Sequence, residues 1–281
     1  MNGSSVKTGV SAFIERLRYG VTAARDSRQI SVNSFQRLFF FLAPEALVER
    51  VVPYGRFRFG GYQFYSRRRD WGVVSQVLLH DEYDILEGLL RENSRPTIAD
   101  LGASIGLFSL RVFSLRPAAV IHAVEPSPGS FHLLTRNRIE NPGLAWHLHQ
   151  AAIWREDGRV TFRSDPNASP QSAIAADGNA VVPAMRVHTL LTRYIRTRVD
   201  LVKMDIEGGE EAAVCDDQSW LSQIGDLLIQ IHPGRCDHLR VTDVLRQHFT
   251  HVYHIPGRAS PNPLYGALRG QCLRGSNHTP S

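Results

Sequence analysis

The chain has 281 residues, of which 43% are hydrophobic and 21% charged, and its net charge is +5. This length accommodates one well-packed domain with an appendage, and the apolar fraction excludes wholesale disorder and collagen-like structure. Three cysteines cannot form a disulfide framework, and no two of them stand at metal-ligand spacing, so we expect a reducing, cytoplasmic environment.

Neither a membrane nor a nucleic acid is expected as a partner. The longest apolar run, 38–43, is far shorter than the roughly 20 residues that span a bilayer, and the first residues lack the pattern of a secretion signal, so we expect neither a membrane span nor secretion. Lys7 and Lys203 are the only lysines among 32 basic residues, a skew typical of GC-rich codon usage. Apart from the run 67–69, basic residues are interleaved with acidic ones, whereas a nucleic-acid interface clusters them.

The N-terminal part of the chain reads as helices followed by a hairpin. Apolar spacing predicts helices within 11–25 and 31–52, the second broken by Pro44. Aromatic residues then alternate around Gly60-Gly61, which is a turn signal between two short strands. We expect residues 1–74 to form a cap on the substrate side of the main domain.

Strands and helices alternate in the rest of the chain. In chain order we expect helix 73–92, strand 97–102, helix 105–116, strand 119–126, helix 127–141, strand 144–153, side strands at 158–164 and 180–187, strand 199–208, a helix from 210, strand 226–234, helix 236–249, and strands at 250–256 and 264–269. This alternation predicts an α/β fold in which a parallel sheet carries helices on both faces. Its ligand site belongs at the carboxyl ends of the strands, where strand order reverses. The Ser-, Pro- and Asn-rich segment 164–180 is predicted to be a surface loop.

The first informative motif is Asp-Leu-Gly-Ala-Ser-Ile-Gly at 100–106, on a strand-to-helix turn. Gly102 allows a ligand to approach the backbone closely, and Gly106 allows the helix start to pack against the strand. The dinucleotide fingerprint is absent because Ser104 stands at its second glycine. Asp100 would repel a pyrophosphate but attract the ammonium and sulfonium groups of S-adenosylmethionine.

Two further acidic sites follow later strands. Glu125 ends the second strand about twenty residues after the glycines, the offset at which an acid binds ribose hydroxyls; alternatively it caps the next helix. Asp205 ends the fourth strand and therefore points into the same crevice, with Glu207 and Glu210 close behind it. Glu210 could instead cap the helix that follows.

Together these motifs resemble the FkbM-type methyltransferases. The similarity rests on residues 100–109, on Val-Glu-Pro at 124–126 and on Val-Asp-Leu-Val-Lys-Met-Asp-Ile-Glu-Gly-Gly-Glu at 199–210, and it covers about 75–256. It implies a Rossmann-like, seven-stranded class I methyltransferase sheet, with a main domain at 75–256 and a C-terminal strand and tail at 257–281. Two positions depart from the family pattern: Ser104 replaces a usual Asn, and Gln230 stands where an acid is common.

The resemblance also implies roles for individual residues. Glu125 would hold the ribose, and Asp205 and Glu207 would border the transferable methyl group. Near the adenine we expect Ala152 and Ile153. The turn residues expected at the methionine end of the cofactor are Asp100, Gly102, Ala103, Ser104 and Gly106.

The implied reaction is O-methylation of a sugar, a glycan or a natural-product hydroxyl of polyketide type. Candidates for the base that removes the hydroxyl proton are Asp205, Glu207 and His232, the last at the end of the fifth strand. Alternatively Asp205 and Glu207 could bind a divalent cation such as Mg²⁺ that lowers the pKa of the hydroxyl. The sequence does not separate these mechanisms.

Other classes of protein remain as alternatives. A nucleic-acid methyltransferase is disfavoured because residues 205–208 are acidic and lack a stacking ring, and an NAD-dependent oxidoreductase because the glycine fingerprint is missing. A non-catalytic nucleotide-binding protein is the third alternative. The expected partner is a small-molecule or glycan acceptor, and a second copy of the chain could pair through 38–41.

Overall fold

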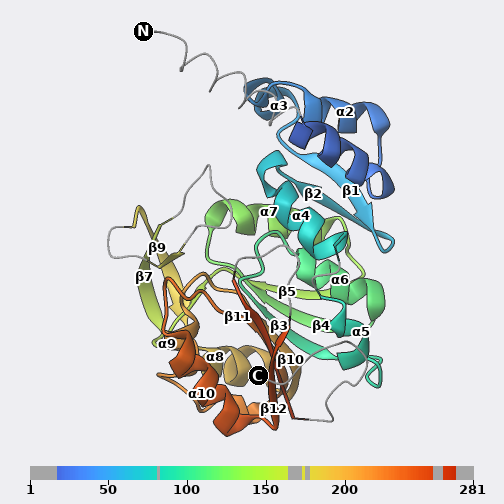
Figure 1. The fold of residues 1–281 in the computed structure, drawn as a ribbon. Coiled ribbons are helices and arrows are strands. Elements are labelled where there is room, and N and C mark those ends of the chain that lie inside the picture. Colours follow the sequence, from blue (N-terminus) through green and yellow to red (C-terminus); the bar gives the residue numbers. More distant parts are fainter. Residues whose placement is uncertain (1–17, 81–82, 164–172, 175–177, 256–261, 270–281) are drawn as a thin grey trace.

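The structure is a computed structural model, which describes residues 18–80, 83–163, 173–174, 178–255 and 262–269 (Figure 1). Within these residues the strands form a central sheet of seven strands, a small sheet of four and a two-stranded hairpin. Helices cover the central sheet, and the hairpin with the N-terminal helices lies at one end of the molecule.

The central sheet is mostly parallel, as the sequence predicts. In order across the sheet its strands are β12 (His251–Ile255), β13 (Leu264–Leu268), β11 (Ile224–Gln230), β10 (Val199–Met204), β3 (Thr97–Leu101), β4 (Val120–Val124) and β5 (Ala145–His149). Only β13 runs antiparallel to its neighbours within this described sheet. From β3 the chain adds β4 and β5 toward one edge of the sheet, and from β10 it adds β11 toward the opposite edge. The order therefore reverses between β3 and β10, where such folds bind ligands.

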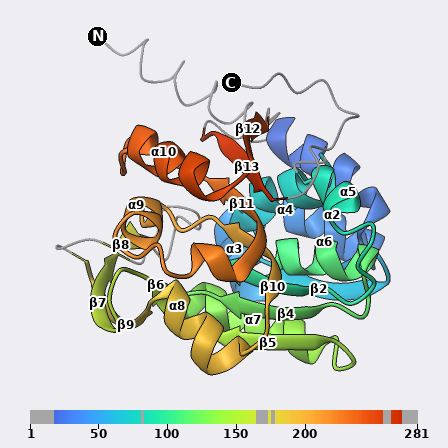
Figure 2. The same ribbon diagram turned by 90° about the horizontal axis from the view of Figure 1, so that it is seen from below.

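Alternate residues of each strand pack into two separate apolar cores, because successive side chains point to opposite faces. Ile98 and Leu201 belong to one core, and their neighbours Ala99 and Val202 belong to the other. Each face is covered by its own helices, with α4, α5 and α6 on one side and α8, α9 and α10 on the other (Figure 2). The helices are α4 (Trp71–Leu78), α5 (Ile85–Leu89), α6 (Leu107–Leu115), α7 (Pro128–Ile139), α8 (Val187–Thr189), α9 (Glu210–Val214) and α10 (His238–His248).

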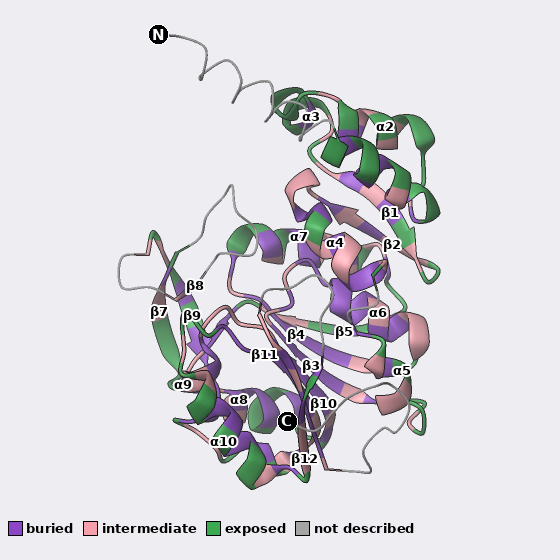
Figure 3. Cartoon of the chain, viewed as in Figure 1, coloured by how far each residue is buried: buried purple, intermediate pink, exposed green. Residues whose placement is uncertain are grey.

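The N-terminal helices match the predicted break. Residues 18–26 are helical, a 3-10 turn follows at Ser27–Gln29, and Pro44 separates α2 (Ser34–Leu42) from α3 (Glu45–Val51). Figure 3 shows the contrast between the buried strands of the central sheet and the exposed outer surfaces of α2 and α3. Phe40 and Phe41, from the run considered for pairing with a second copy, are buried within this chain.

The hairpin joins the cap to the main sheet. It consists of β1 (Gly55–Phe59) and β2 (Tyr62–Ser66), paired around the predicted glycine turn. Tyr65 donates its backbone N–H to the Asn137 side chain of α7 at 2.7 Å, and Gln63 likewise donates to Asn141 at 3.2 Å. Two asparagine side chains one helical turn apart thus accept hydrogen bonds from backbone N–H groups on the outer edge of β2. The division of the chain at 74 and 256 stays a prediction, although β13 lies in the central sheet.

Helix 73–92, predicted as continuous, is interrupted. Apolar spacing continues through α4 and α5, but the chain turns between them and buries Tyr83 edge-to-face against Phe108, with the ring centroids 5.0 Å apart. The spacing of apolar residues could not predict this break, because the contact that stabilises it involves a residue of another helix. A 3-10 turn, Arg68–Asp70, leads directly into α4.

The predicted strand 144–153 is divided between two sheets. After β5 the chain leaves the central sheet, and β6 (Ala152–Ile153) pairs with β9 (Ala180–Met185) of the small sheet. The small sheet is completed by β7 (Gly158–Arg163) and β8 (Ala173–Ile174). Of the predicted loop, residues 164–172 and 175–177 lie outside the described residues.

Residues 187–195 form a helix that the sequence analysis missed. Here α8 continues into a π-helical stretch at Leu190–Ile195, and a 3-10 turn at Leu221–Gln223 precedes β11. Leu190 and Leu191 pack into the core beneath β10, so tertiary burial stabilises this segment. Across the described residues, no helix combines the length and apolarity needed to cross a bilayer.

Substitution of Gly106 tests the packing of the glycine turn. An added Cβ would lie 2.4 Å from the Trp146 ring, and the residue has a φ of +91°. We expect Gly106→Ala to lower the free energy of unfolding by about 1–3 kcal/mol or more, measured by urea denaturation. The control is Gly72→Ala in α4, where a Cβ meets nothing within 4 Å; helix propensity there predicts no loss. Equal stability of the two variants would contradict this packing role.

Candidate active site

Four loops meet at the carboxyl ends of β3, β4, β10 and β11, where strand order reverses. A cavity open to solvent lies at the ends of β3, β4 and β10. The residues that line it are Val73, Gly102, Ser104, Val124, Glu125, Pro126, Ser130, Ala151, Ala152, Ile153, Phe162, Ile174, Asp205, Ile206 and Glu207.

The turns after β3 and β10 touch each other through their backbones. A Cβ on Gly102 would lie 1.7 Å from the carbonyl oxygen of Asp205, and Gly102 has a φ of +75°. Ser104, in the same turn, also has a positive φ of 51°. Because only glycine allows this contact, Gly102 places the glycine turn directly against the acidic turn.

Asp100, which the resemblance places at the methionine end of the cofactor, lies behind the glycine turn. It is fully buried at the end of β3, accepts a hydrogen bond from Ser109 Oγ at 2.7 Å and lies 3.3 Å from Lys203 Nζ. Among the described residues that line the cavity, Asp100, Ala103 and Gly106 do not occur. Asp100 is therefore positioned to support the glycine turn from behind.

Lys203 was not singled out by the sequence analysis, although it is one of two lysines in an arginine-rich chain. It pairs with Asp100 across neighbouring strands and donates to the carbonyl oxygen of Gly102 at 2.8 Å. Burial alone would lower the pKa of Lys203, but the carboxylates of Asp100 and Asp205 outweigh it and raise this pKa. Lys203 thus remains a buried cation that ties both turns together.

Glu125 connects the glycine turn to the loop after β4. Its carboxylate accepts the backbone N–H groups of Ser104 and Ser127, each at 2.8 Å, and the residue lines the cavity. Burial raises the pKa of Glu125 to about 7. Ser127 is the N-cap of α7, so Glu125 contacts the start of that helix. Because Glu125 also lines the cavity, the helix contact and a ligand contact are compatible.

The predicted adenine contacts, Ala152 and Ile153, both line the cavity. Three apolar residues that the sequence analysis did not select line it too: Val73 of α4, Phe162 of β7 and Ile174 of β8. They come from distant parts of the chain, so no local motif could identify them. Gln230, at the end of β11, is not among the described lining residues.

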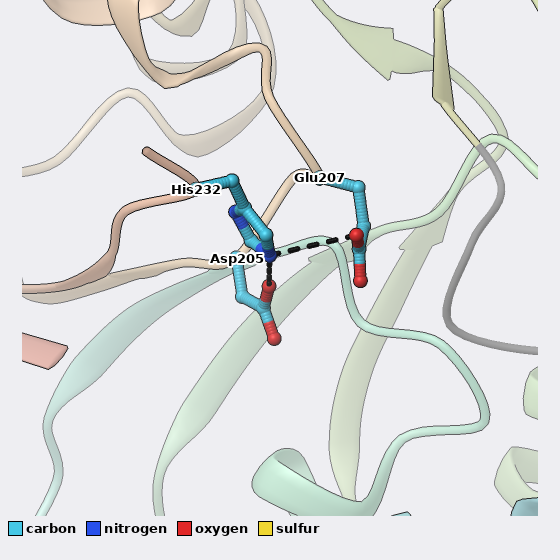
Figure 4. A group of neighbouring side chains, drawn as sticks. All are labelled: Asp205, Glu207 and His232. Atoms are coloured by element: carbon cyan, nitrogen blue, oxygen red, sulfur yellow. Dashed lines mark ion pairs between the residues drawn. The ribbon is translucent and has the colours of Figure 1, made fainter. Parts of the chain in front are cut away.

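The three predicted catalytic residues come together at the ends of β10 and β11. Figure 4 shows the His232 ring directed at both carboxylates. Nε2 of His232 lies 3.7 Å from Asp205 Oδ1 and 3.5 Å from Glu207 Oε2. Arg235 pairs with Glu207 at 2.9 Å from the outer side. The sequence placed these residues at one sheet edge, and the structure brings them into one cluster.

Glu210 holds His232 in this orientation. It is fully buried, and its Oε1 lies 2.8 Å from His232 Nδ1. The same oxygen accepts the backbone N–H groups of Ile206 and Gly208. The helix-capping alternative for Glu210 therefore describes only part of its contacts, because the histidine comes from another strand.

Burial dominates the electrostatics of the cluster. It raises the pKa of Glu207 to about 7 and raises that of Asp205, against the opposing effects of His232 and Lys203. Burial also acts to lower the pKa of His232, but the Glu210 hydrogen bond and the surrounding carboxylates raise it overall. The three side chains therefore hold a proton more readily than they would in water.

The chain belongs to the FkbM methyltransferase family, since the model of the family described as "Methyltransferase FkbM domain" matches residues 100–251, more than half of the chain. This confirms the resemblance seen in the sequence. The roles of the individual site residues stay predictions.

Two characterised relatives are similar over part of their length. Hexuronic acid methyltransferase AglP of Haloferax volcanii is 25% identical over 158 residues, covering 56% of this chain and 64% of the relative. The 31-O-demethyl-FK506 methyltransferase FkbM of Streptomyces tacrolimicus is 32% identical over 117 residues, covering 41% and 44%. The chain thus spans less than two thirds of these relatives. A solved structure, precorrin-6y C5,15-methyltransferase of Geobacter metallireducens, has a TM-score of 0.41 and 15% identity, covering 65% of this chain and 83% of that one.

The Lys203–Asp100 pair yields a stability prediction. Lys203→Met leaves Asp100 as an uncompensated buried charge, so we expect the free energy of unfolding to fall by about 3–5 kcal/mol in urea denaturation. Adding Asp100→Asn should recover about 1–3 kcal/mol of this loss, because the orphaned charge is removed.

A surface pair provides the matched control for Lys203→Met. Arg246 and Asp243 form an exposed ion pair at 3.1 Å on α10. Arg246→Met should cost about 0.5 kcal/mol or less. A loss from Lys203→Met no larger than this value would contradict the structural role of the buried pair.

Proposed function

We propose that this chain transfers a methyl group from S-adenosylmethionine to a hydroxyl of a sugar or natural-product acceptor. The observation that carries the proposal is the position of the Asp205, Glu207 and His232 cluster. Asp205 and Glu207 line the cavity beside Gly102, and the buried His232, which is not among the described lining residues, lies next to both carboxylates. A site for proton removal thus stands beside a site for a nucleoside cofactor.

The cavity offers complementary groups to each part of S-adenosylmethionine. The apolar residues Ile153 and Phe162 suit a flat adenine. Glu125 has lone pairs left after its two backbone contacts, and these can accept ribose hydroxyl protons. Gly102 leaves the backbone accessible to the methionine part, next to the negative charge of Asp205.

Methyl transfer from a sulfonium is an in-line displacement. The acceptor oxygen forms a bond to the methyl carbon while the carbon–sulfur bond breaks, and its electron pair stays on sulfur. Alignment of oxygen, methyl and sulfur can contribute about 7–11 kcal/mol. The hydroxyl proton must also leave, and a positioned base adds about 10²- to 10⁴-fold in rate. Asp205, Glu207 and His232 are the groups placed to receive that proton, directly or through water.

The relatives support the acceptor class. One is named for a hexuronic acid and the other for a position on FK506, so both names point to oxygen-rich acceptors. The acidic turn at 205–208 also suits a neutral hydroxyl better than a phosphate-bearing polymer. We therefore favour a sugar or a natural-product hydroxyl over a nucleic acid.

Calorimetry and a label-transfer assay test the proposed function. We expect the purified chain to bind S-adenosylmethionine and S-adenosylhomocysteine but not NAD, and to transfer labelled methyl from the former to glycoside or macrolide hydroxyls. The transferred label should resist mild alkali, since an ether survives conditions that hydrolyse a methyl ester. No affinity for either nucleoside would refute the proposal, and an alkali-labile label would refute hydroxyl methylation.

Cofactor affinity should depend on the protonation of Glu125. Its pKa is about 7, and only the carboxylate can accept both backbone N–H groups and ribose hydroxyls. S-adenosylhomocysteine affinity should therefore rise by up to about tenfold per pH unit below pH 7 and level off above it, as measured by calorimetry. Glu125→Gln should bind more weakly and lose this dependence.

The control for Glu125→Gln is Glu140→Gln, at the C-terminal end of α7, where the side chain faces Arg56 at 3.9 Å. It should retain the affinity and the pH profile of the unmodified chain. A pH-independent affinity in the unmodified chain would argue against ribose binding by Glu125.

A further inference from the structure

Three potential metal ligands converge in the proposed active site. One atom from each of Asp205, Glu207 and His232 can be chosen so that all lie within 4.8 Å of one another. Two of these residues follow β10 and the third follows β11, so the framework of two adjacent strands fixes their separation. Figure 4 shows both carboxylates beside the Nε2 nitrogen of the His232 ring.

The spacing suits an ion better than a direct contact. The distances of 3.5 and 3.7 Å from His232 Nε2 to the two carboxylates exceed the roughly 2.7–3.2 Å of an N–H···O hydrogen bond. When an ion lies about 2.1 Å from each ligand atom, two neighbouring ligand atoms are about 3.0 Å apart in octahedral geometry. In tetrahedral geometry they are about 3.4 Å apart. The two distances from His232 Nε2 are close to these values, and the three ligand atoms all lie within 4.8 Å of one another.

Buried polar atoms in the cluster lack partners. Nε2 of His232 and Oδ1 of Asp205 have no hydrogen-bond partner among the described residues, and the His232 side chain is only 5% exposed. A buried polar atom left unpaired costs about 1–3 kcal/mol, so native proteins rarely leave one without a protein group, a water or a ligand as its partner. Both atoms point into the space between the three side chains.

The contact behind His232 prepares it as a ligand. Oε1 of Glu210 already accepts two backbone N–H groups, so its contact with Nδ1 is best made by the Nδ1–H donating to it. The lone pair of a neutral imidazole then lies on Nε2, facing Asp205 and Glu207. A carboxylate on the outer nitrogen of a ligating histidine is the usual support in metal sites.

We propose that Asp205, Glu207 and His232 bind one divalent first-row transition cation, such as Mn²⁺, with Glu210 orienting the histidine. The imidazole favours such a cation over Mg²⁺, which prefers oxygen ligands and retains water. Three protein ligands leave positions open to the acceptor. Cation binding is independent of the proposed function. The role of the cation, to lower the pKa of the acceptor hydroxyl, rests on that function.

Electron paramagnetic resonance of Mn²⁺ tests the site without an activity assay. The full chain is treated with EDTA, transferred to chelator-free buffer and titrated with MnCl₂, while the signal of free Mn²⁺ reports binding. We expect one Mn²⁺ per chain, retained in a tenfold excess of Mg²⁺. Asp205→Asn and His232→Gln should each weaken binding at least about tenfold, and Glu210→Gln by about 10- to 100-fold.

The matched control is His149→Gln. His149 stacks with His122 on neighbouring strands, and their ring nitrogens lie 3.1 Å apart, so this pair is another place where imidazoles could capture a metal. The control should bind Mn²⁺ as tightly as the unmodified chain. Thermal unfolding of each variant verifies that it is folded, and added Mn²⁺ should raise the unfolding temperature of the unmodified chain.

The outcomes separate the cation site from the proposed function. Absence of stoichiometric Mn²⁺ binding, binding unchanged by Asp205→Asn and His232→Gln, or binding lost in His149→Gln would each overturn the site. S-adenosylhomocysteine binding is measured on the same samples. Retained cofactor binding without Mn²⁺ binding rejects only the cation, whereas absent cofactor binding rejects the proposed function whatever Mn²⁺ does.

Discussion

The buried ion pair between Lys203 and Asp100 is the interaction on which the site depends. These residues are direct register partners on β10 and β3, the two strands between which the chain order reverses. Lys203 also donates to Gly102, so one cation holds the end of β3 and the glycine turn together. Burying such a pair is costly, and hydrogen bonds from Ser109 to Asp100 Oδ2 and from Lys203 to the Gly102 carbonyl offset part of the cost, while Asp100 Oδ1 faces Lys203 alone.

From this pair outward, each contact fixes the next. Gly102 rests on the carbonyl of Asp205, which sets the path of the acidic turn, and Glu210 closes that turn by accepting its backbone N–H groups. The same Glu210 oxygen orients His232 from the neighbouring strand. The positive φ of Glu207, 56°, is maintained within this framework, so a strained residue is held where its carboxylate faces the cavity.

Much of the fold and part of the site could be predicted from local pattern. The alternation of buried strands with amphipathic helices specifies the parallel sheet, and acids directly after strands must meet at its carboxyl edge. Asp205, Glu207 and His232 were selected in this way, and the structure brings them together while their catalytic roles stay predictions. Asp100 illustrates the limit of the method: being an acid in the right motif did not reveal that its carboxylate faces Ser109 and Lys203. The side strands β7 and β9 were predicted, whereas β6 was assigned to the preceding strand and helix 187–195 was missed, because their pairing and burial involve distant segments.

The sequence by itself determined the order of elements, the switch point and which chemical groups stand at it, because these follow from periodicity and from residue type at strand ends. Only the tertiary structure decided how those groups pair. It joined Lys203 to Asp100, set Glu210 behind His232, and brought Val73 and Phe162 to one cavity wall. The physical reason is that pairing and burial depend on distances between segments far apart in the chain, which no local pattern encodes.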